Sequence, residues 1–250
     1  MRRTRLHAGG LDAWILEPEE PAAPPELNVL LCHGYGAPGD DLVALAPELS
    51  EEDRALSSRC RWIFPEAPLS LEEMGNPWGR AWWQLDIERL LTGRDWTRFV
   101  EELPAGLPKA RRMLHAFLDE VAAQTNVPLS RTVLGGFSQG GMLATDLALR
   151  LEEAPAGLII LSGTLLARAE WTERIARRTA MPVFQSHGRM DPLLPFEVAE
   201  QLRQLFEDAG AKVTFVPFHA EHTIAPEVLQ RLAAWLKDRL SEGNSPSRWP

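Results

Sequence analysis

The chain has 250 residues, of which 45% are hydrophobic and 24% charged, and its formal net charge is −9 at pH 7. This composition is that of an ordinary globular protein with a sizeable core. The acidic balance argues against a nucleic-acid partner, which would favour clustered basic residues. No apolar run is long enough to span a bilayer. We therefore expect a soluble protein with no nucleic-acid partner and no membrane insertion.

The chain contains two cysteines, Cys32 and Cys60. Two cysteines provide neither a disulfide framework nor a metal cluster, which is typical of a reducing compartment. The basic N-terminus is not followed by an apolar run of signal-peptide length. These features predict a cytoplasmic protein that needs no metal. We expect no cofactor, and either a monomer or a homodimer.

The first part of the chain predicts a hairpin and two buried strands. Residues 4–7 and 12–16 flank a Gly-Gly pair, and residues 27–32 and 61–64 are short apolar runs. From residue 65 to residue 107 the sequence predicts an irregular segment, with scattered prolines and glycines and four of the nine tryptophans. A loop of this length is usually functional or disordered, and its tryptophans argue against disorder.

The second half alternates between predicted helices and strands. Apolar residues at helical spacing predict helices at 109–124, 140–151, 195–209 and 228–240, and short apolar runs predict strands at 132–134, 158–161, 182–185 and 213–216. This alternation predicts an α/β fold with a mostly parallel central sheet and helices on both faces. We expect one domain over residues 1–240 and a loose tail at 241–250.

Ser138 lies between a predicted strand and a predicted helix, within the sequence G-F-S-Q-G. This pattern matches the nucleophile elbow, a sharp turn that exposes a serine hydroxyl at the carboxyl edge of a sheet. Gly136 and Gly140 would permit a close approach of neighbouring backbone. The alternative is a glycine-rich turn in which the serine only caps the helix.

A serine nucleophile needs a base and a group that orients the base. In this fold the acid and then the histidine follow the serine, each in a loop after a later strand. Asp191 follows the predicted strand at 182–185, and His222 follows the strand at 213–216. His219 is a weaker candidate for the base, and His187 is expected to hydrogen-bond backbone near the acid.

Two backbone N–H groups should stabilise the negative charge that develops on a substrate carbonyl oxygen. We expect them at Gln139, directly after the serine, and at Tyr35, in the glycine-containing loop after Cys32. The alternative for this loop is a flexible surface turn.

Several motifs together resemble those of a known family: L-L-C-H-G-Y-G, R-A-W-W-Q-L-D-I, G-G-F-S-Q-G-G-M, L-S-G, H-G-R-M-D-P-L-L-P and H-T-I. From about residue 28 to residue 236 the chain resembles the phospholipase/carboxylesterase family of α/β-hydrolases, which includes the acyl-protein thioesterases. The resemblance implies a metal-independent serine esterase of the α/β-hydrolase fold with no large cap domain. It implies Ser138 as nucleophile, Asp191 as acid, His222 as base, and Tyr35 and Gln139 as anion-pocket donors. Glu221 stands where the family usually has glycine.

We predict a carboxylesterase that cleaves short-to-medium acyl oxyesters or thioesters. The partner that we expect is its small-molecule ester substrate. The residues expected to bind substrate are Met74, Trp78, Trp82, Trp83, Leu165 and Leu194. Tryptophan suits the wall of an acyl pocket, but large aromatic side chains equally often pack a minor core under a loop. Two other functions remain open: a non-catalytic binding protein of the same fold, and a peptidase or amidase with the same triad.

Overall fold

The computed structural model describes residues 1–19, 23–86, 90 and 96–242. Eight strands form the main sheet: β1 (Arg2–Ala8), β2 (Leu11–Glu17), β3 (Leu27–Cys32), β4 (Cys60–Pro65), β7 (Thr132–Phe137), β8 (Gly157–Leu161), β9 (Val183–Gly188) and β10 (Val213–Phe218). Their spatial order is β1-β2-β4-β3-β7-β8-β9-β10. β1–β2 and β2–β4 pair antiparallel, and the remaining pairs are parallel. The predicted mostly parallel sheet is confirmed.

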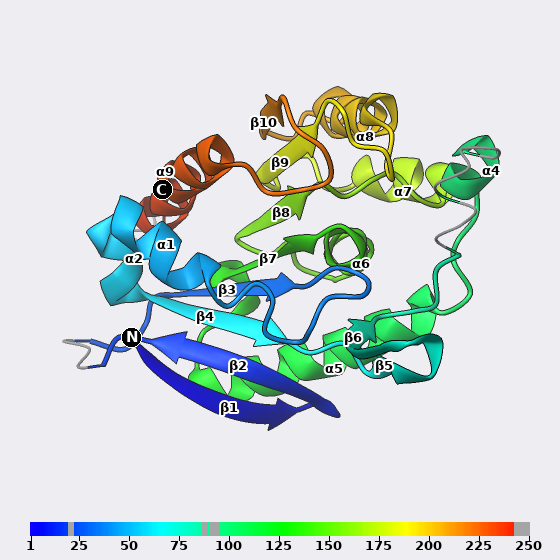
Figure 1. The fold of residues 1–250 in the computed structure, drawn as a ribbon. Helices are drawn as coiled ribbons and strands as arrows, with labels where there is room; N and C mark the ends of the chain where they lie inside the picture. Colours follow the sequence, from blue (N-terminus) through cyan, green and yellow to red (C-terminus); the bar gives the residue numbers. More distant parts are fainter. Residues whose placement is uncertain (20–22, 87–89, 91–95, 243–250) are drawn as a thin grey trace.

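Helices cover both faces of this sheet (Figure 1). The helices on one face are α1 (Leu45–Glu52), α2 (Arg54–Arg59) and α9 (Pro226–Glu242), and those on the other are α5 (Leu107–Thr125), α6 (Gln139–Ala148), α7 (Arg168–Ile175) and α8 (Phe196–Asp208). Buried strand residues alternate between the two apolar layers because successive side chains point to opposite faces. On β3, for example, Val29 and Leu31 belong to the layer under α9, whereas Leu30 and Cys32 belong to the layer under α5 and α6.

The segment that the sequence predicts as irregular, residues 65–107, contains more regular structure than expected. β5 (Leu69–Leu71) and β6 (Asn76–Ala81) form a separate antiparallel hairpin that encloses one 3₁₀ turn (Glu72–Met74). Gly75, at φ +85°, ends that turn. α4 (Trp96–Glu101) follows later in the segment and lies near α7. The short α1, α2 and α7 are also absent from the elements that the sequence predicts.

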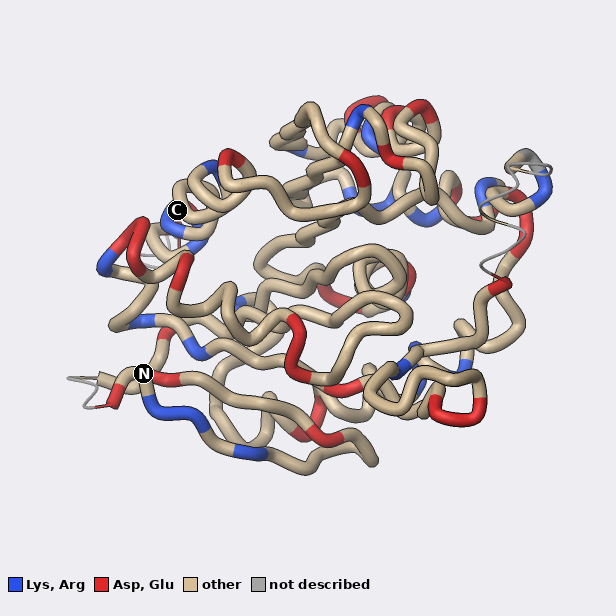
Figure 2. Tube along the Cα trace, in the orientation of Figure 1, with Lys and Arg blue, Asp and Glu red and all other residues tan. Residues whose placement is uncertain are grey.

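The two edge strands of the main sheet, β1 and β10, differ in composition. β1 carries three arginines, which pair in turn with carboxylates: Arg2 with Glu17, Arg3 with Asp40, and Arg5 with Glu66. Figure 2 shows this basic strand beside the N-terminus. At the opposite edge, β10 contains Pro217, which lacks a backbone N–H.

The carboxyl ends of β3, β7, β9 and β10 meet along one edge of the sheet, because these strands run parallel. The loops that leave this edge carry the predicted catalytic and anion-pocket residues. No helix in the described part of the chain is both long and apolar enough to cross a membrane. The predicted tail lies mostly outside the described residues, and its first two residues belong to α9.

Candidate active site

Ser138 lies in the tight turn between β7 and α6, with φ 52° and ψ −118°. A positive φ is uncommon for a residue that has a Cβ, and it costs about 1–3 kcal/mol. The side chain makes no capping hydrogen bond to α6. The alternative role for this serine, helix capping, therefore does not explain the strained turn.

The glycines around Ser138 permit the close contact between this turn and β3. A Cβ at Gly136 or at Gly140 would overlap the carbonyl oxygen of Cys32, and a Cβ at Gly141 would lie 2.9 Å from the carbonyl oxygen of Gly136. Backbone atoms cannot move aside as a flexible side chain can, so only glycine fits. The first turn of α6 is thereby pressed against the end of β3, and the Ser138 hydroxyl stands at the sheet edge.

Asp191 and His222 meet at the same edge. Asp191 lies in the loop after β9 and His222 in the loop after β10, and Asp191 Oδ2 is 2.6 Å from His222 Nδ1. The ring of His222 also packs on that of Phe137, the residue before Ser138, with 4.8 Å between centroids. The structure thus brings an oriented imidazole next to the nucleophile turn.

Both carboxylate oxygens of Asp191 have hydrogen-bond partners. Oδ1 accepts hydrogen bonds of 2.9 Å from the backbone N–H groups of Leu193 and Leu194. Burial by itself raises the pKa of Asp191, but hydrogen bonds from His187 and His222 outweigh it and hold that pKa well below the usual range of an aspartate. Asp191 is therefore anionic at neutral pH and can hold His222 in the tautomer with its proton on Nδ1.

Ser138 and His222 line one cavity of about 110 Å³. Its other walls are formed by Gly34, Tyr35, Ala37, Asp41, Leu85, Leu90, Phe137, Met142, Leu193 and Leu194. Contacts among the described residues include no hydrogen bond between Ser138 Oγ and His222. Catalytic hydrogen bonds are often long without substrate and shorten when the substrate binds.

The predicted anion pocket lies at the same cavity. Tyr35 belongs to the loop after β3, and Gln139 is the first residue of α6. Hydrogen bonds between described residues leave the backbone N–H groups of Tyr35 and Gln139 without a partner. The Tyr35 hydroxyl is 3.2 Å from Gln84 Oε1 and 3.9 Å from Met74 Sδ, and the second contact directs this side chain toward the β5–β6 hairpin.

The loop that carries Tyr35 is not a flexible turn, because hydrogen bonds from buried groups fix it. His33 Nε2 accepts from the backbone N–H of Ala67, and its Nδ1 lies 2.8 Å from the carbonyl oxygen of Gly34. Burial lowers the pKa of His33. The indole N–H of Trp82 donates to the His33 carbonyl, and the Gln139 side chain accepts from the Trp82 N–H and donates to the Trp83 carbonyl.

The structure places three of the predicted substrate-binding residues in the core instead of the pocket. Trp82 and Trp83 are only 2% and 1% exposed, and Leu165 is fully buried in the same apolar layer. None of the three lines the cavity at Ser138. Their position fits the alternative, in which large aromatic side chains pack under a long loop.

The other three predicted residues differ in position. Leu194 lines the cavity. Met74, at 62% exposure, lines an adjoining open groove of about 490 Å³ that shares Tyr35 and Leu85 with the cavity. Trp78, at 80% exposure, projects from β6 and lines neither hollow.

Sequence reasoning missed several residues of the site. Asp41, Leu85, Phe137, Met142 and Leu193 line the cavity. Phe137, Met142 and Leu193 could have been found, because each lies within four residues of a predicted catalytic residue. Leu85 offers no comparable signal. His219, the weaker candidate base, is exposed and makes no contact with Asp191 among the described residues.

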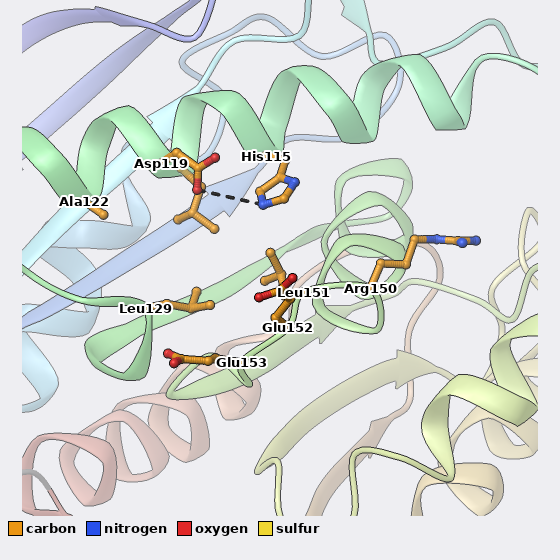
Figure 3. Close-up of a pocket in the computed structure, with 9 residues that line it drawn as sticks. His115, Asp119, Ala122, Leu129, Arg150, Leu151, Glu152 and Glu153 are labelled. Atoms are coloured by element: carbon orange, nitrogen blue, oxygen red, sulfur yellow. Dashed lines mark ion pairs between the residues drawn. The ribbon is translucent and has the colours of Figure 1, made fainter.

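A second hollow, of about 400 Å³, lies between α5 and the turn after α6 (Figure 3). Leu118, Leu129 and Leu151 contribute apolar walls, and His115 Nε2 lies 3.8 Å from Asp119 Oδ1 at its margin. Arg150 is bound to Asp146 and Glu170. The described lining residues include no serine, threonine or cysteine nucleophile, so this hollow is a poor candidate for a hydrolytic site.

A mostly parallel sheet with helices on both faces, and a strained serine between a central strand and the next helix, define the α/β-hydrolase class. A family model described as phospholipase/carboxylesterase matches residues 14–240. The chain is 33% identical over 223 residues to a probable carboxylesterase of Oryza sativa subsp. japonica, with 86% of this chain and 89% of the relative covered. It is 30% identical over 224 residues to acyl-protein thioesterase 1 of Eremothecium gossypii, with 88% and 90% covered.

Among solved structures, the esterase PE8 superposes with a TM-score of 0.76 and is 32% identical, covering 90% of this chain and 96% of that one. The chain therefore belongs to the phospholipase/carboxylesterase family, as the sequence motifs predict. It is a carboxylic ester hydrolase, and the alternative of a non-catalytic binding protein is not supported.

Proposed function

We propose that the protein is a serine carboxylesterase in which Ser138, His222 and Asp191 form the catalytic triad. The observation that carries this proposal is one cavity lined by both the strained Ser138 and His222, whose Nδ1 is 2.6 Å from Asp191 Oδ2. A hydrogen-bonded carboxylate fixes the imidazole so that Nε2 is free to accept a proton. This arrangement serves the attack of a serine hydroxyl on an ester carbonyl.

The reaction proceeds in two halves. His222 Nε2 takes the hydroxyl proton as Ser138 Oγ bonds to the carbonyl carbon, and it gives the proton to the leaving group as the ester bond breaks. A water then attacks the acyl-enzyme and gives a proton to His222 Nε2, which passes it to Ser138 Oγ as the bond between Oγ and the acyl carbon breaks, so that the acid and the free serine are released. The unpaired N–H groups of Tyr35 and Gln139 are the donors for the oxyanion in both halves.

The size of the cavity supports a short-to-medium acyl group. Pockets for drug-sized ligands span about 300–1,000 Å³, whereas the cavity at Ser138 measures about 110 Å³. A longer part of the substrate, in the acyl or alcohol group, would extend into the open groove lined by Leu71, Met74 and Leu85. Oxyesters fit this proposal, and the relatives named acyl-protein thioesterases favour testing thioesters alongside them.

The test is a series of p-nitrophenyl esters from acetate to dodecanoate, with matched thioesters and amides, on the wild type and on Ser138→Ala. We expect hydrolysis of the short and medium esters to fall by up to about 10⁶-fold in the variant. A fluorophosphonate probe should label the wild type but not Ser138→Ala. Retained turnover, or labelling at another serine, would exclude Ser138 as the nucleophile.

A further inference from the structure

His187 lies on β9, one residue before its end, and its side chain is completely buried. Its Nε2 is 2.8 Å from the carbonyl oxygen of Leu194 and 3.3 Å from Asp191 Oδ2. The sequence predicts only the backbone contact. The second contact places a buried histidine directly against the catalytic carboxylate.

The two neighbours of Nε2 decide where the ring carries its proton. A carbonyl oxygen can only accept, so the ring carries a proton on Nε2, which donates to Leu194 and faces Asp191 Oδ2 at the longer distance. Nδ1 is then an acceptor, and among the described residues this buried atom has no hydrogen-bond partner. A buried acceptor without a donor is costly. Any role of this histidine must therefore come from the contacts that Nε2 makes with Leu194 and Asp191.

Nε2 contacts the loop that presents the acid at two positions, Asp191 and Leu194. Asp191 Oδ1 already accepts from the N–H groups of Leu193 and Leu194, which leaves Oδ2 to be shared between His222 and His187. The Leu194 carbonyl accepts from His187, while the Leu194 side chain lines the cavity at Ser138. One N–H thus ties the acid and a wall of the substrate cavity to strand β9.

We propose that His187 is a positioning residue for the hydrolytic reaction, which aims Asp191 Oδ2 at His222 Nδ1 and keeps Leu194 in place. This inference rests on the triad proposed above. A misplacement of about 1 Å in a reacting group, caused by a change away from the chemistry, can cost about 100-fold in rate. His187 does not touch the substrate, so its loss should appear mainly in kcat.

The test compares His187→Leu, which removes the donor, with His187→Gln, whose amide nitrogen falls near the position of Nε2. His115→Gln, at an exposed histidine of α5, is the matched control. The readouts are kcat and KM for p-nitrophenyl acetate and the pH dependence of kcat/KM. Rates are expressed per active site titrated with a fluorophosphonate, so that unfolded protein is not counted.

We expect His187→Leu to lower kcat by up to about 100-fold with little change in KM, and His187→Gln to recover most of it. The acidic limb of the kcat/KM profile should move to lower pH in His187→Leu, because a carboxylate that is no longer aimed at His222 Nδ1 stabilises the protonated imidazole less. A purely structural residue would not move this limb. If His187→Leu does not fold, His187→Asn replaces it, since its amide is too short to reach Asp191.

Two results would overturn the proposal: a folded donor-free variant with the kcat and pH profile of the wild type, or a glutamine variant no better than leucine. Ser138→Ala separates this failure from failure of the proposed function. If Ser138→Ala is inactive and His187→Leu is unaffected, only the proposed role of His187 is excluded. If Ser138→Ala is active, the proposed triad itself is excluded.

Discussion

The hydroxyl of Ser162 donates a 2.9 Å hydrogen bond to the carbonyl oxygen of Thr223, the residue after His222. Ser162 directly follows β8 and has φ 48°, although glycine would adopt that conformation at lower cost. Its backbone N–H donates to Ser186 on β9. The strained serine therefore connects the sheet to the loop that carries the proposed base.

Ser162→Ala and Ser162→Gly should separate stability from activity. Both remove the partly buried hydrogen bond to Thr223, which is worth about 0.5–1.5 kcal/mol, but only glycine also relieves the backbone strain. We expect Ser162→Gly to be the more stable of the two variants in urea unfolding, while kcat falls in both. Wild-type kcat in both variants would show that Ser162 does not position the base loop.

Gly140→Ala tests the packing of the nucleophile turn, with Gly75→Ala as its control. A Cβ at Gly140 meets the Cys32 carbonyl oxygen, whereas a Cβ at Gly75 meets nothing within 4 Å although φ is +85°. We expect Gly75→Ala to cost about 1–2 kcal/mol of the free energy of unfolding, from strain alone. Gly140→Ala should cost about 3 kcal/mol or more and abolish esterase activity. Equal costs would contradict the tight approach of α6 to β3.

Trp82→Ala and Trp78→Ala should differ strongly in stability. Trp82 is buried and donates to the His33 carbonyl, so its loss should cost about 3–5 kcal/mol. The exposed Trp78 should change the free energy of unfolding by no more than about 0.5 kcal/mol. Chemical denaturation checks both values. A stable Trp82→Ala variant with an altered preference for acyl-chain length would instead indicate that Trp82 contributes to the wall of the substrate pocket.

Asp41 should favour substrates that carry a positive charge. It lines the cavity at Ser138, and no hydrogen bond or ion pair between described residues involves its carboxylate, whereas the adjacent Asp40 pairs with Arg3. A partly exposed charge pair is worth about 1 kcal/mol, or roughly 5-fold. The measurement is kcat/KM for acetylcholine divided by kcat/KM for 3,3-dimethylbutyl acetate, its neutral isostere. We expect Asp41→Asn to lower this ratio by roughly 5-fold. Asp40→Asn, which removes the same charge, should leave the ratio unchanged, and an equal effect of the two would rule out recognition by Asp41.

Asp191 should make stability depend on pH in the acidic range. Its pKa is depressed in the folded protein, so the unfolded chain binds this proton more readily and stability falls as pH drops below about 4. The stabilising contribution is fully present at neutral pH. Asp191→Asn should therefore flatten the acidic limb of a plot of unfolding free energy against pH. Parallel plots for the variant and the wild type would show that Asp191 does not contribute.

The parts of the molecule that the sequence predicts well are those with a short-range physical signature. Apolar runs mark β3 and β8, and the glycines beside Ser138 mark a turn that tolerates no Cβ. The loops of Asp191 and His222 follow from the parallel sheet, because every such strand ends at the same edge.

The remaining features depend on contacts between distant segments, which no local pattern reports. The orientation of Trp82 is set by a carbonyl 49 residues earlier, at His33. The β5–β6 hairpin escapes prediction because its strands are short and its register shifts between Ser70 and Leu71. The contact between His187 and Asp191 needs the fold of the loop between them, which spacing alone does not give.

The paired arginines of β1 and the proline of β10 have a consequence for how the protein behaves at high concentration. An exposed sheet edge invites another chain to add a strand, which leads to aggregation. A strand added beside β1 would have to accommodate Arg2, Arg3 and Arg5 with their bound carboxylates. A strand added beside β10 would find no N–H at Pro217. Both open ends of the main sheet are thus poor templates for intermolecular β-pairing, and the enzyme can display a long parallel sheet without polymerising along it.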